Sequence, residues 1–288
     1  GDRTVQHCSN TRPITYCGQP KNRRRWEIRL LDEESELEFT KPSKVWSILK
    51  KWINPKVAEL ERTAVYTFRS MVSKKWMKGR LFIAGDAAHL MPPFMGQGMC
   101  AGIRDVANLA WKLVAEIKNQ AEAGLLDTYE SERVPHVQKY IDTAIKLGGL
   151  INATDPTNAF ESSKKNTKNG TTMKSLYPEL GIGLGSFLGS NLKKHRGLIA
   201  SQPRLSKNQL MDDLSGYKSL FISRNPIKGL LANISELPFL CIDTIAEPGL
   251  NQFLDDLSVE AVLIRPDRYI LGTAKSFDEQ EALISIRY

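Results

Sequence analysis

The residues best suited to chemistry lie in one run, from Gly85 to Gly98, which reads Gly-Asp-Ala-Ala-His-Leu-Met-Pro-Pro-Phe-Met-Gly-Gln-Gly. It begins where a short apolar segment ends, and open α/β sheets bind ligands at the carboxyl ends of their strands. The carboxylate of Asp86 could accept hydrogen bonds there from sugar-alcohol hydroxyls. The small Ala87 and the glycines let a flat ring approach the backbone. The run therefore predicts a cofactor site.

A long helix is expected directly after this run, because apolar residues recur at steps of three and four. The first N–H groups of a helix, here including those of Met99 and Cys100, have no intrahelical acceptor and favour an electron-rich ligand edge. The face predicted to be buried consists of Ile103, Val106, Ala107, Ala110, Leu113, Val114 and Ile117.

The elements on either side of the run indicate a mixed α/β fold (α+β). Leu81 to Ala84 is apolar without alternation, which predicts a strand buried on both faces, as in a parallel sheet. A second helix is expected from Leu125 to Ile151, with a kink or restart at Pro135. Smaller elements are expected further away: strands over 13–17, 25–31, 64–72, 219–223, 239–242 and 260–264, a loop over 32–38 and a helix over 42–53.

Composition excludes several classes of protein. The 288 residues are 41% hydrophobic, enough to bury a core, so global disorder is excluded. The net charge is +8, but the 40 Lys and Arg are spread among 32 acids, which is typical of a solvated surface rather than a nucleic-acid interface. Four isolated cysteines predict no metal cluster and fit a reducing compartment. No apolar run could span a bilayer, so we expect a cytoplasmic protein without a membrane partner.

The run resembles the flavin-contacting signature of the flavoprotein aromatic hydroxylases, the single-component FAD monooxygenases. In that signature Gly-Asp-Ala-Ala-His precedes Pro-Pro, Gly-Gln-Gly and then Gly-x-x-Asp-x-x-Asn-Leu-Ala-Trp-Lys-Leu, which residues 102–113 supply. Residues 125–135, Leu-Leu-Asp-Thr-Tyr-Glu-Ser-Glu-Arg-Val-Pro, are also typical of the group. The resemblance covers residues 79–136 most specifically.

Within this group the sequence is most similar to 3-(3-hydroxyphenyl)propionate hydroxylases, on residues 23–27, 92–105 and 202–204. Members end in a thioredoxin-like domain without its redox pair. The resemblance implies four stretches: a remnant of the substrate-binding sheet at 1–77, an FAD-binding part at 78–151, a linker at 152–205 and a thioredoxin-like domain at 206–288.

The sequence departs from the family before the run. The family holds the ADP half of FAD with Gly-x-Gly-x-x-Gly after a first strand, and nothing of this kind precedes Gly85. The glycine-rich stretch 181–186 ends in Ser and has no strand before it, so it is expected to be an ordinary loop. The Asp-Gly motif of the dinucleotide fold is absent too. We therefore expect that an N-terminal dinucleotide-binding segment is missing.

The resemblance implies an enzyme that reduces FAD with NADH or NADPH and transfers one oxygen atom from O2 to a phenolic ring. The expected substrate is similar to 3-(3-hydroxyphenyl)propionate, in aromatic catabolism, and a homodimer is left open. Pro93 is implied beside the reactive edge of the ring. The implied cofactor contacts are Ala84, Gly85, Asp86, Ala87, Pro93, Gly96, Gln97, Gly98, Met99 and Cys100.

Several alternatives stay open. The substrate could instead be another phenol, an aromatic polyketide or an antibiotic, or the chain could be a non-catalytic partial flavoprotein that lacks the ADP-binding half. Asp86 could serve only as a helix cap, and Pro93 could serve only to shape the turn. His89 is expected to be structural, and Asp105 is expected to pair within its helix or with a nearby loop.

Overall fold

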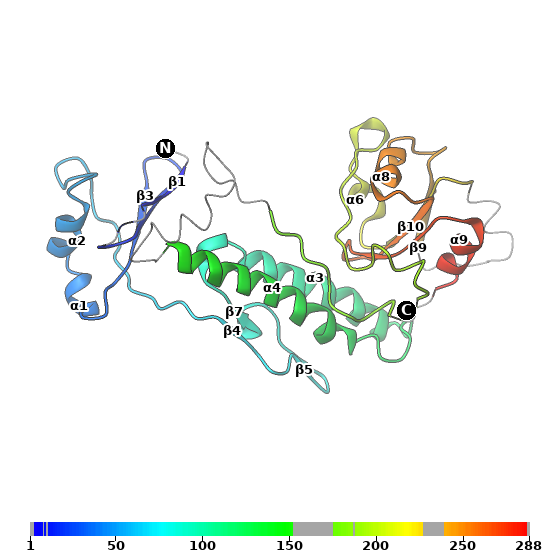
Figure 1. The fold of residues 1–288 in the computed structure, drawn as a ribbon, viewed down its shortest axis with the longest axis horizontal. Coiled ribbons are helices and arrows are strands. Elements are labelled where there is room, and N and C mark those ends of the chain that lie inside the picture. The colour runs from blue at the N-terminus through cyan, green and yellow to red at the C-terminus, as the bar shows by residue number, and fades with distance from the viewer. Residues whose placement is uncertain are drawn as a thin grey trace. The chain divides into compact units, whose positions relative to one another are not determined.

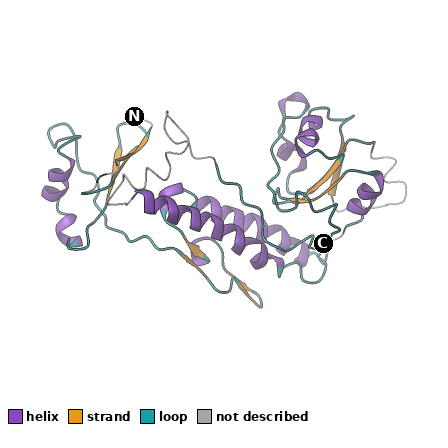
Figure 2. Cartoon of the chain, viewed as in Figure 1, coloured by secondary structure: helices purple, strands orange, loops and turns teal. Residues whose placement is uncertain are grey.

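The computed structural model describes residues 3–7, 9, 11–151, 175–186, 188–226 and 239–286. The chain forms two compact units. Figure 1 colours the chain by residue number, and Figure 2 colours it by secondary structure. The first unit comprises residues 1–69, 92–94 and 143–174, and the second comprises 70–91, 95–142 and 175–288. Among the described residues, no helix has the length and the hydropathy that crossing a bilayer would require.

The first unit contains a three-stranded antiparallel sheet and two helices. The strands run in the order β1, β2, β3, with Tyr16 opposite Trp26 across the last pair. Pro42 begins the second helix, where its missing N–H has no helical partner in any case. Two predicted strands and one predicted helix are confirmed, with β1 and α1 in addition; the loop predicted over 32–38 is wrong at its end, where α1 begins at Glu36. The bounds are β1 Thr4–His7, β2 Ile14–Gly18, β3 Arg24–Ile28, α1 Glu36–Phe39 and α2 Pro42–Leu49.

The predicted strand over 64–72 is wrong for most of its length. Residues 58–70 have no regular secondary structure, and only β4 (Met71–Val72) pairs, antiparallel with β7 (His89–Leu90). A strand is defined by its hydrogen-bonded neighbour, and none of the described strands pairs with residues 64–70. The alternation in this segment therefore marks extended chain, and its side chains Tyr66 and Phe68 are exposed.

The buried parallel strand expected at 81–84 is also wrong. β6 is only Leu81–Phe82 and pairs antiparallel with β5 (Met77–Lys78), and Leu81 is 75% exposed. The apolar segment is a short hairpin arm, and the chain then enters the 3-10 turn η1 (Gly85–Ala87). Asp86 is thus presented by a turn rather than by the carboxyl end of a parallel strand.

Two long helices, α3 (Gly98–Ile117) and α4 (Thr128–Ile151), follow as predicted, and α4 continues through Pro135. The predicted buried face of α3 is wrong, because Ile103 is 59% and Ile117 78% exposed. The residues of α3 that are buried instead are Ala101, Asp105, Asn108, Leu109 and Lys112. Paired charges between α3 and α4 bury the polar face of α3, so hydrophobic periodicity selects the opposite face.

The end of the second unit is built on a four-stranded mixed sheet with the order β11, β10, β8, β9. β8 and β9 are parallel, and β10 is antiparallel to both β8 and β11. The three predicted strands are confirmed, and β11 is found in addition. The bounds are η4 Ser206–Asn208, α6 Met211–Ser215, β8 Ser219–Ser223, β9 Phe239–Asp243, α8 Leu250–Leu257, β10 Ala261–Ile264, β11 Ile270–Ala274 and α9 Phe277–Ile284.

Leucines of the predicted linker pack into this part of the molecule. Leu184, Leu188 and Leu192 are buried in the same cluster as Phe221 and Leu263. Residues 152–174 of that linker lie outside the described residues. The division of the chain into four stretches remains a prediction.

Candidate functional site

The run from Gly85 to Gly98 forms a sequence of tight turns before α3. η1 is followed by β7 and by the 3-10 turn η2 (Pro93–Met95), and Gly85 and Gly96 have φ of +59° and +61°, a conformation that favours glycine. Of the predicted cofactor contacts, Asp86, Ala87, Pro93, Gly96 and Met99 are exposed, while Ala84, Gly85, Gln97, Gly98 and Cys100 are half-buried. Pro93 lies in the first unit.

The Gly85–His89 turn lies directly on α3. A Cβ atom added at Gly102 would come within 3.2 Å of the Cα of Gly85, which is tighter than an ordinary contact, so this approach favours glycine. The fully buried carboxylate of Asp105 accepts hydrogen bonds from Gly85 N at 3.0 Å and from His89 Nε2 at 2.7 Å. Asp105 therefore pairs with this turn, and His89 is a buried structural partner, as the sequence predicted.

The start of α3 is open to a ligand. Gln97 precedes the helix and makes no side-chain capping bond, and the first intrahelical bond runs from Ala101 N to Gln97 O. The amides of Gly98, Met99 and Cys100 precede that bond, at the positive end of the helix dipole. Asp86, earlier in the same run, is exposed, and its side chain makes no hydrogen bond to another described residue. Donors and one acceptor are thus available for an electron-rich ring and a polyol.

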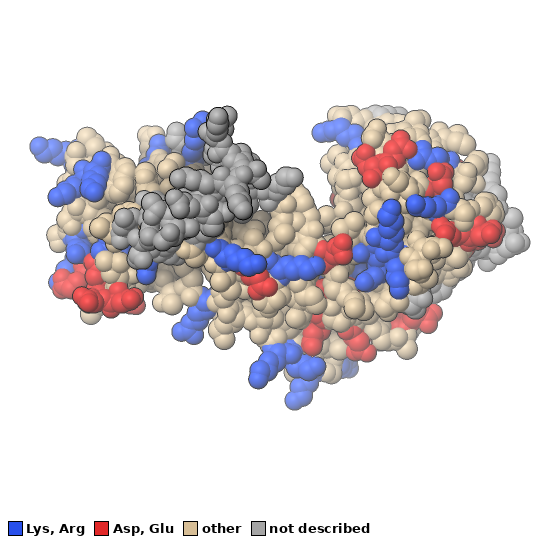
Figure 3. Space-filling model, viewed as in Figure 1, with Lys and Arg blue, Asp and Glu red and all other residues tan. Residues whose placement is uncertain are grey.

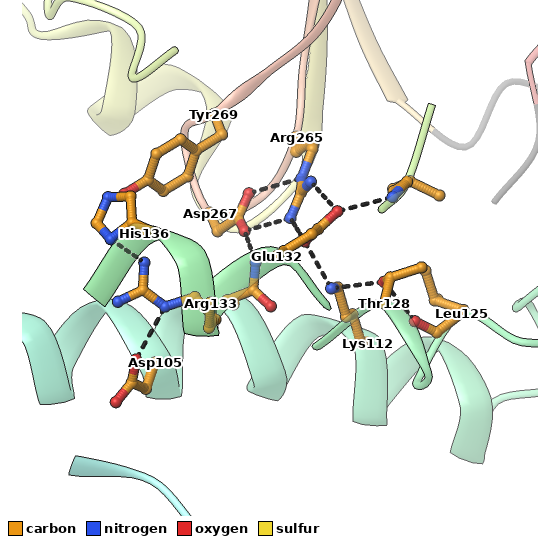
Figure 4. A network of polar contacts seen from close by, with 12 residues as sticks. Asp105, Lys112, Leu125, Thr128, Glu132, Arg133, His136, Arg265, Asp267 and Tyr269 are labelled. Carbon is orange, nitrogen blue, oxygen red and sulfur yellow. Dashed lines mark hydrogen bonds and ion pairs between the residues drawn. The ribbon is translucent and has the colours of Figure 1, made fainter. Parts of the chain in front are cut away.

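A buried network of ions lies behind the run, between α3, α4 and the loop from β10 to β11 (Figure 4). We call it the ion network and define it as Asn108, Lys112, Glu132, Arg265 and Asp267. Glu132 accepts from both terminal nitrogens of Arg265 and from Lys112 Nζ, each at 2.8 Å. Asn108 Nδ2 donates to Glu132 and to Asp267, both at 2.9 Å.

Sequence reasoning missed this network. Its signal was present in α3, where Asn108 and Lys112 are four residues apart and so share one helix face, the face that also carries Asp105. The partners on α4 and after β10 are distant in sequence, so the pairing could be found only from the fold. Asp105, Asn108 and Lys112, which belong to the signature segment in α3, are therefore buried residues with packing and positioning roles.

The electrostatics follow from burial and close partners. Burial lowers the pKa of Lys112 to about 8, against the opposing effect of Glu132. Burial alone would raise the pKa of Glu132, but Arg265 and Lys112 together hold it well below its usual value. Burial and then the charge of Arg133 lower the pKa of His136 to about 2, so this imidazole is neutral. On the face drawn in Figure 3, surface lysines, arginines and acids are intermingled.

The chain is similar to known flavin-dependent proteins. Residues 7–144 match the sequence family described as "FAD binding domain". The chain is 32% identical over 302 residues to a "Probable NADH-specific resorcinol 4-hydroxylase" of Rhodococcus jostii (strain RHA1), over 96% of this chain and 56% of that protein. It is 37% identical over 158 residues to "3-(3-hydroxy-phenyl)propionate/3-hydroxycinnamic acid hydroxylase 2" of Burkholderia vietnamiensis (strain G4 / LMG 22486), over 54% of this chain and 29% of that protein.

Solved structures show the same fold. A complex of aklavinone-11 hydroxylase with FAD and aklavinone matches with a TM-score of 0.65 at 20% identity, over 95% of this chain and 56% of that one. Anhydrotetracycline hydroxylase from Streptomyces rimosus matches with a TM-score of 0.65 at 21% identity, over 96% and 57%. At these identities the likeness establishes the fold alone. The chain aligns along nearly all of its own length with the resorcinol hydroxylase relative and with these two structures. It spans only about half the length of those proteins.

The residues present fit the flavin end of FAD. The uncapped helix start, the exposed Asp86 and the glycines of the run supply donors, an acceptor and close backbone approach. The glycines at 181–185 do not form a dinucleotide loop, because a Cβ at Gly183 would come within 2.3 Å of Glu132 Cγ and Leu184 N donates to Glu132 at 2.8 Å. These glycines allow the chain to pack against α4, which agrees with their prediction as an ordinary loop.

Proposed function

We propose that this chain is the flavin-contacting and C-terminal part of an FAD-dependent monooxygenase that hydroxylates a phenolic ring with O2 and NAD(P)H. The observation that carries the proposal is the packing of the Gly85–His89 turn on α3, where Asp105 holds the backbone N–H of Gly85, together with a helix start that has no side-chain cap. The turn presents the exposed carboxylate of Asp86 and the start of α3 presents free amides, both within the run that resembles the family's flavin signature. Bound FAD would supply the redox chemistry, taking electrons from the nicotinamide cofactor and passing them to O2.

The residues of the run have separate roles in this proposal. The Asp86 carboxylate accepts hydrogen bonds from the sugar-alcohol chain of the cofactor. The amides of Met99 and Cys100, at the positive end of the helix dipole, would stabilise negative charge on the electron-rich edge of a bound ring. Gly96 and Gly98 would let the ring approach the backbone, and the role of Pro93 beside its reactive edge is proposed from the sequence resemblance alone. The same role of cofactor contact is proposed for Ala84, Gly85, Ala87 and Gln97.

The substrate is proposed from the relatives. Two of them are named for small phenols, resorcinol and 3-(3-hydroxyphenyl)propionate, so we propose a phenol of this size and NADH as electron donor. An aromatic polyketide is the alternative, which the two structural neighbours support by fold only. The proposal also includes a homodimer and a cytoplasmic location, both of which rest on the sequence alone.

We also propose that the sheet from β8 to β11 is thioredoxin-like. Its support is the parallel pair β8 and β9, the antiparallel strands β10 and β11 at the other side of β8, and the closing helix α9. Cys241 stands alone on β9, and burial raises the pKa of its thiol to about 11, which disfavours the reactive thiolate. A redox role for this cysteine is therefore no part of the proposal.

Flavin retention by the purified 288-residue chain is the test. After incubation with FAD and gel filtration, we expect visible flavin absorbance to elute with the protein. Asp86→Ala should weaken FAD binding by roughly tenfold or more, as the loss of a hydrogen bond to a charged group does. Asp32→Ala, at an exposed acid of the first unit, is the matched control and should bind like the parent. NADH oxidation with resorcinol or 3-(3-hydroxyphenyl)propionate then ranks the substrates.

A second candidate function is a non-catalytic partial flavoprotein chain. Two observations favour it: the glycines at 181 and 183 pack against α4 and form no pyrophosphate loop, and four apolar side chains of α3 are exposed, those of Ile103, Val106, Val114 and Ile117. A colourless protein after incubation with FAD would support this candidate. Retained flavin together with phenol-dependent NADH oxidation would exclude it.

A further inference from the structure

The Gly85–His89 turn is fixed from beneath by one carboxylate. Both oxygens of Asp105 are used, since Oδ2 accepts from Gly85 N and His89 Nε2 while Oδ1 accepts from Arg133 Nε at 2.8 Å. All of these side chains are buried, and Asp105 and Arg133 are 0% exposed. Water therefore cannot replace a lost partner easily, and the position of Gly85 N depends on where Arg133 holds Asp105.

The hydrogen bonds continue from Arg133 toward the C-terminal sheet. Arg133 Nη1 donates to His136 Nδ1 at 2.8 Å, and His136 Nε2 lies 3.1 Å from Tyr269 Oη. Because a guanidinium only donates, Nδ1 must be the acceptor, and a neutral imidazole then carries its proton on Nε2. His136 therefore donates to the Tyr269 hydroxyl, and Figure 4 shows the ring of Tyr269 beside His136 and Arg133 beside Asp105.

Tyr269 is itself held in place by the ion network. It directly precedes β11 and follows Arg265 and Asp267, which bind Glu132 and Asn108. Glu132 and Arg133 are consecutive residues of α4, so the loop from β10 to β11 contacts the same helix turn along two branches. The side chain of Tyr269 is 2% exposed and packs edge to face on His136, with ring centroids 5.9 Å apart.

We propose that the loop from β10 to β11 positions the Gly85–His89 turn through this chain of buried contacts, with Tyr269, His136, Arg133 and Asp105 as positioning residues. The inference gives the C-terminal sheet a task in the cofactor site that is separate from substrate binding. Its meaning for catalysis rests on the proposed function. The physical coupling between Tyr269 and Gly85 does not depend on that function and can be measured without a cofactor.

The test removes one hydroxyl group at the far end of the chain. Tyr269→Phe keeps the ring and its packing but leaves the His136 Nε2 proton without its acceptor. We expect the amide of Gly85, followed by hydrogen–deuterium exchange, to exchange on the order of fivefold to tenfold faster, the change that the loss of one buried hydrogen bond produces. Tyr217→Phe is the matched control, because Tyr217 belongs to the same part of the chain and is 94% exposed.

A spectroscopic readout separates positioning from general destabilisation. The chain has four histidines, so selective 15N labelling can resolve the ring nitrogens of His89 and His136. In Tyr269→Phe the His136 signal must change directly, and we expect the His89 signal to shift as well while amides of β8 and β10 keep their exchange rates. Unchanged His89 signals and unchanged exchange at Gly85 would overturn the proposal.

Asp105→Asn provides the second variant. It removes the charge that Arg133 and His89 share and should accelerate exchange at Gly85 more than Tyr269→Phe does. If Asp105→Asn releases the turn but Tyr269→Phe does not, the positioning stops at Arg133 and the proposed role of the C-terminal loop is wrong. Both readouts use the chain without FAD, so failure to retain FAD would contradict the proposed function and leave this result intact.

Discussion

The two halves of the second unit bury opposite kinds of side chain. In the sheet from β8 to β11 the central residues are apolar and inaccessible, with Leu220, Phe221 and Leu263 all 0% exposed. Between α3 and α4, residues at 0% exposure include Asp105, Lys112, Glu132 and Arg133. Apolar contact is non-directional, whereas buried charges require defined partners at defined distances. The sheet therefore serves mainly stability, whereas the helix pair fixes the geometry of the residues that support the run.

Among the variants that test this difference between the two halves, Glu132→Gln should change the free energy of unfolding most. The carboxylate balances Arg265 and Lys112, and breaking a buried ion pair on one side costs about 3 to 5 kcal/mol of unfolding free energy. Leu263→Met, a substitution of similar volume in the sheet core, should cost less than about 1.5 kcal/mol. Urea unfolding measures both changes.

The control for Glu132→Gln is Glu281→Gln, at an exposed acid of α9, which should change the unfolding free energy by less than about 0.5 kcal/mol. If Glu132→Gln costs no more than Leu263→Met, the two halves tolerate small changes equally well, and the distinction between them fails.

The pH dependence of stability should come next in size. The pKa of His136 is about 2 in the folded chain, against 6.5 for an unperturbed histidine. Below pH 6.5 the unfolded chain takes up a proton at His136 that the folded chain does not. The free energy of unfolding therefore decreases as the pH is lowered, by up to about 1.4 kcal/mol per pH unit. Between pH 6.5 and 5 the loss attributable to His136 should be about 1.5 kcal/mol, measured by urea unfolding across this range.

His136→Gln removes the titrating group and should flatten this profile. His195→Gln is the comparison variant, since burial also lowers the pKa of His195, in the same direction but at a less buried position. The lowered pKa values of Asp105 and Glu132 act below about pH 4.5, outside the chosen window. A profile as steep in His136→Gln as in the parent would mean that His136 does not stay neutral on folding.

The sequence predicted the apolar half well and the ionic half poorly. Residues 219–223, for example, contain consecutive apolar side chains, which predict a buried strand. Strand β8 has the same bounds as this prediction. For α3, the same reasoning placed the helix correctly and its buried face wrongly. A polar residue is assigned to solvent unless its partner is known, and the partners of Lys112 and Asn108 lie on α4 and beyond β10. The run itself was found from its motif, while its support by Asp105 required the fold.

The smallest effect is expected on the exposed face of α3, where structure and periodicity disagree most directly. Ile103→Lys should change the unfolding free energy by no more than about 0.5 kcal/mol, because its side chain is already 59% exposed. Leu109→Lys on the same helix is the matched comparison; Leu109 is 9% exposed, and an ammonium group there would lose its hydration and cost several times more. Equal losses in the two variants would place Ile103 in the core after all, and the charged face of α3 would then not be the one that holds the helix pair together.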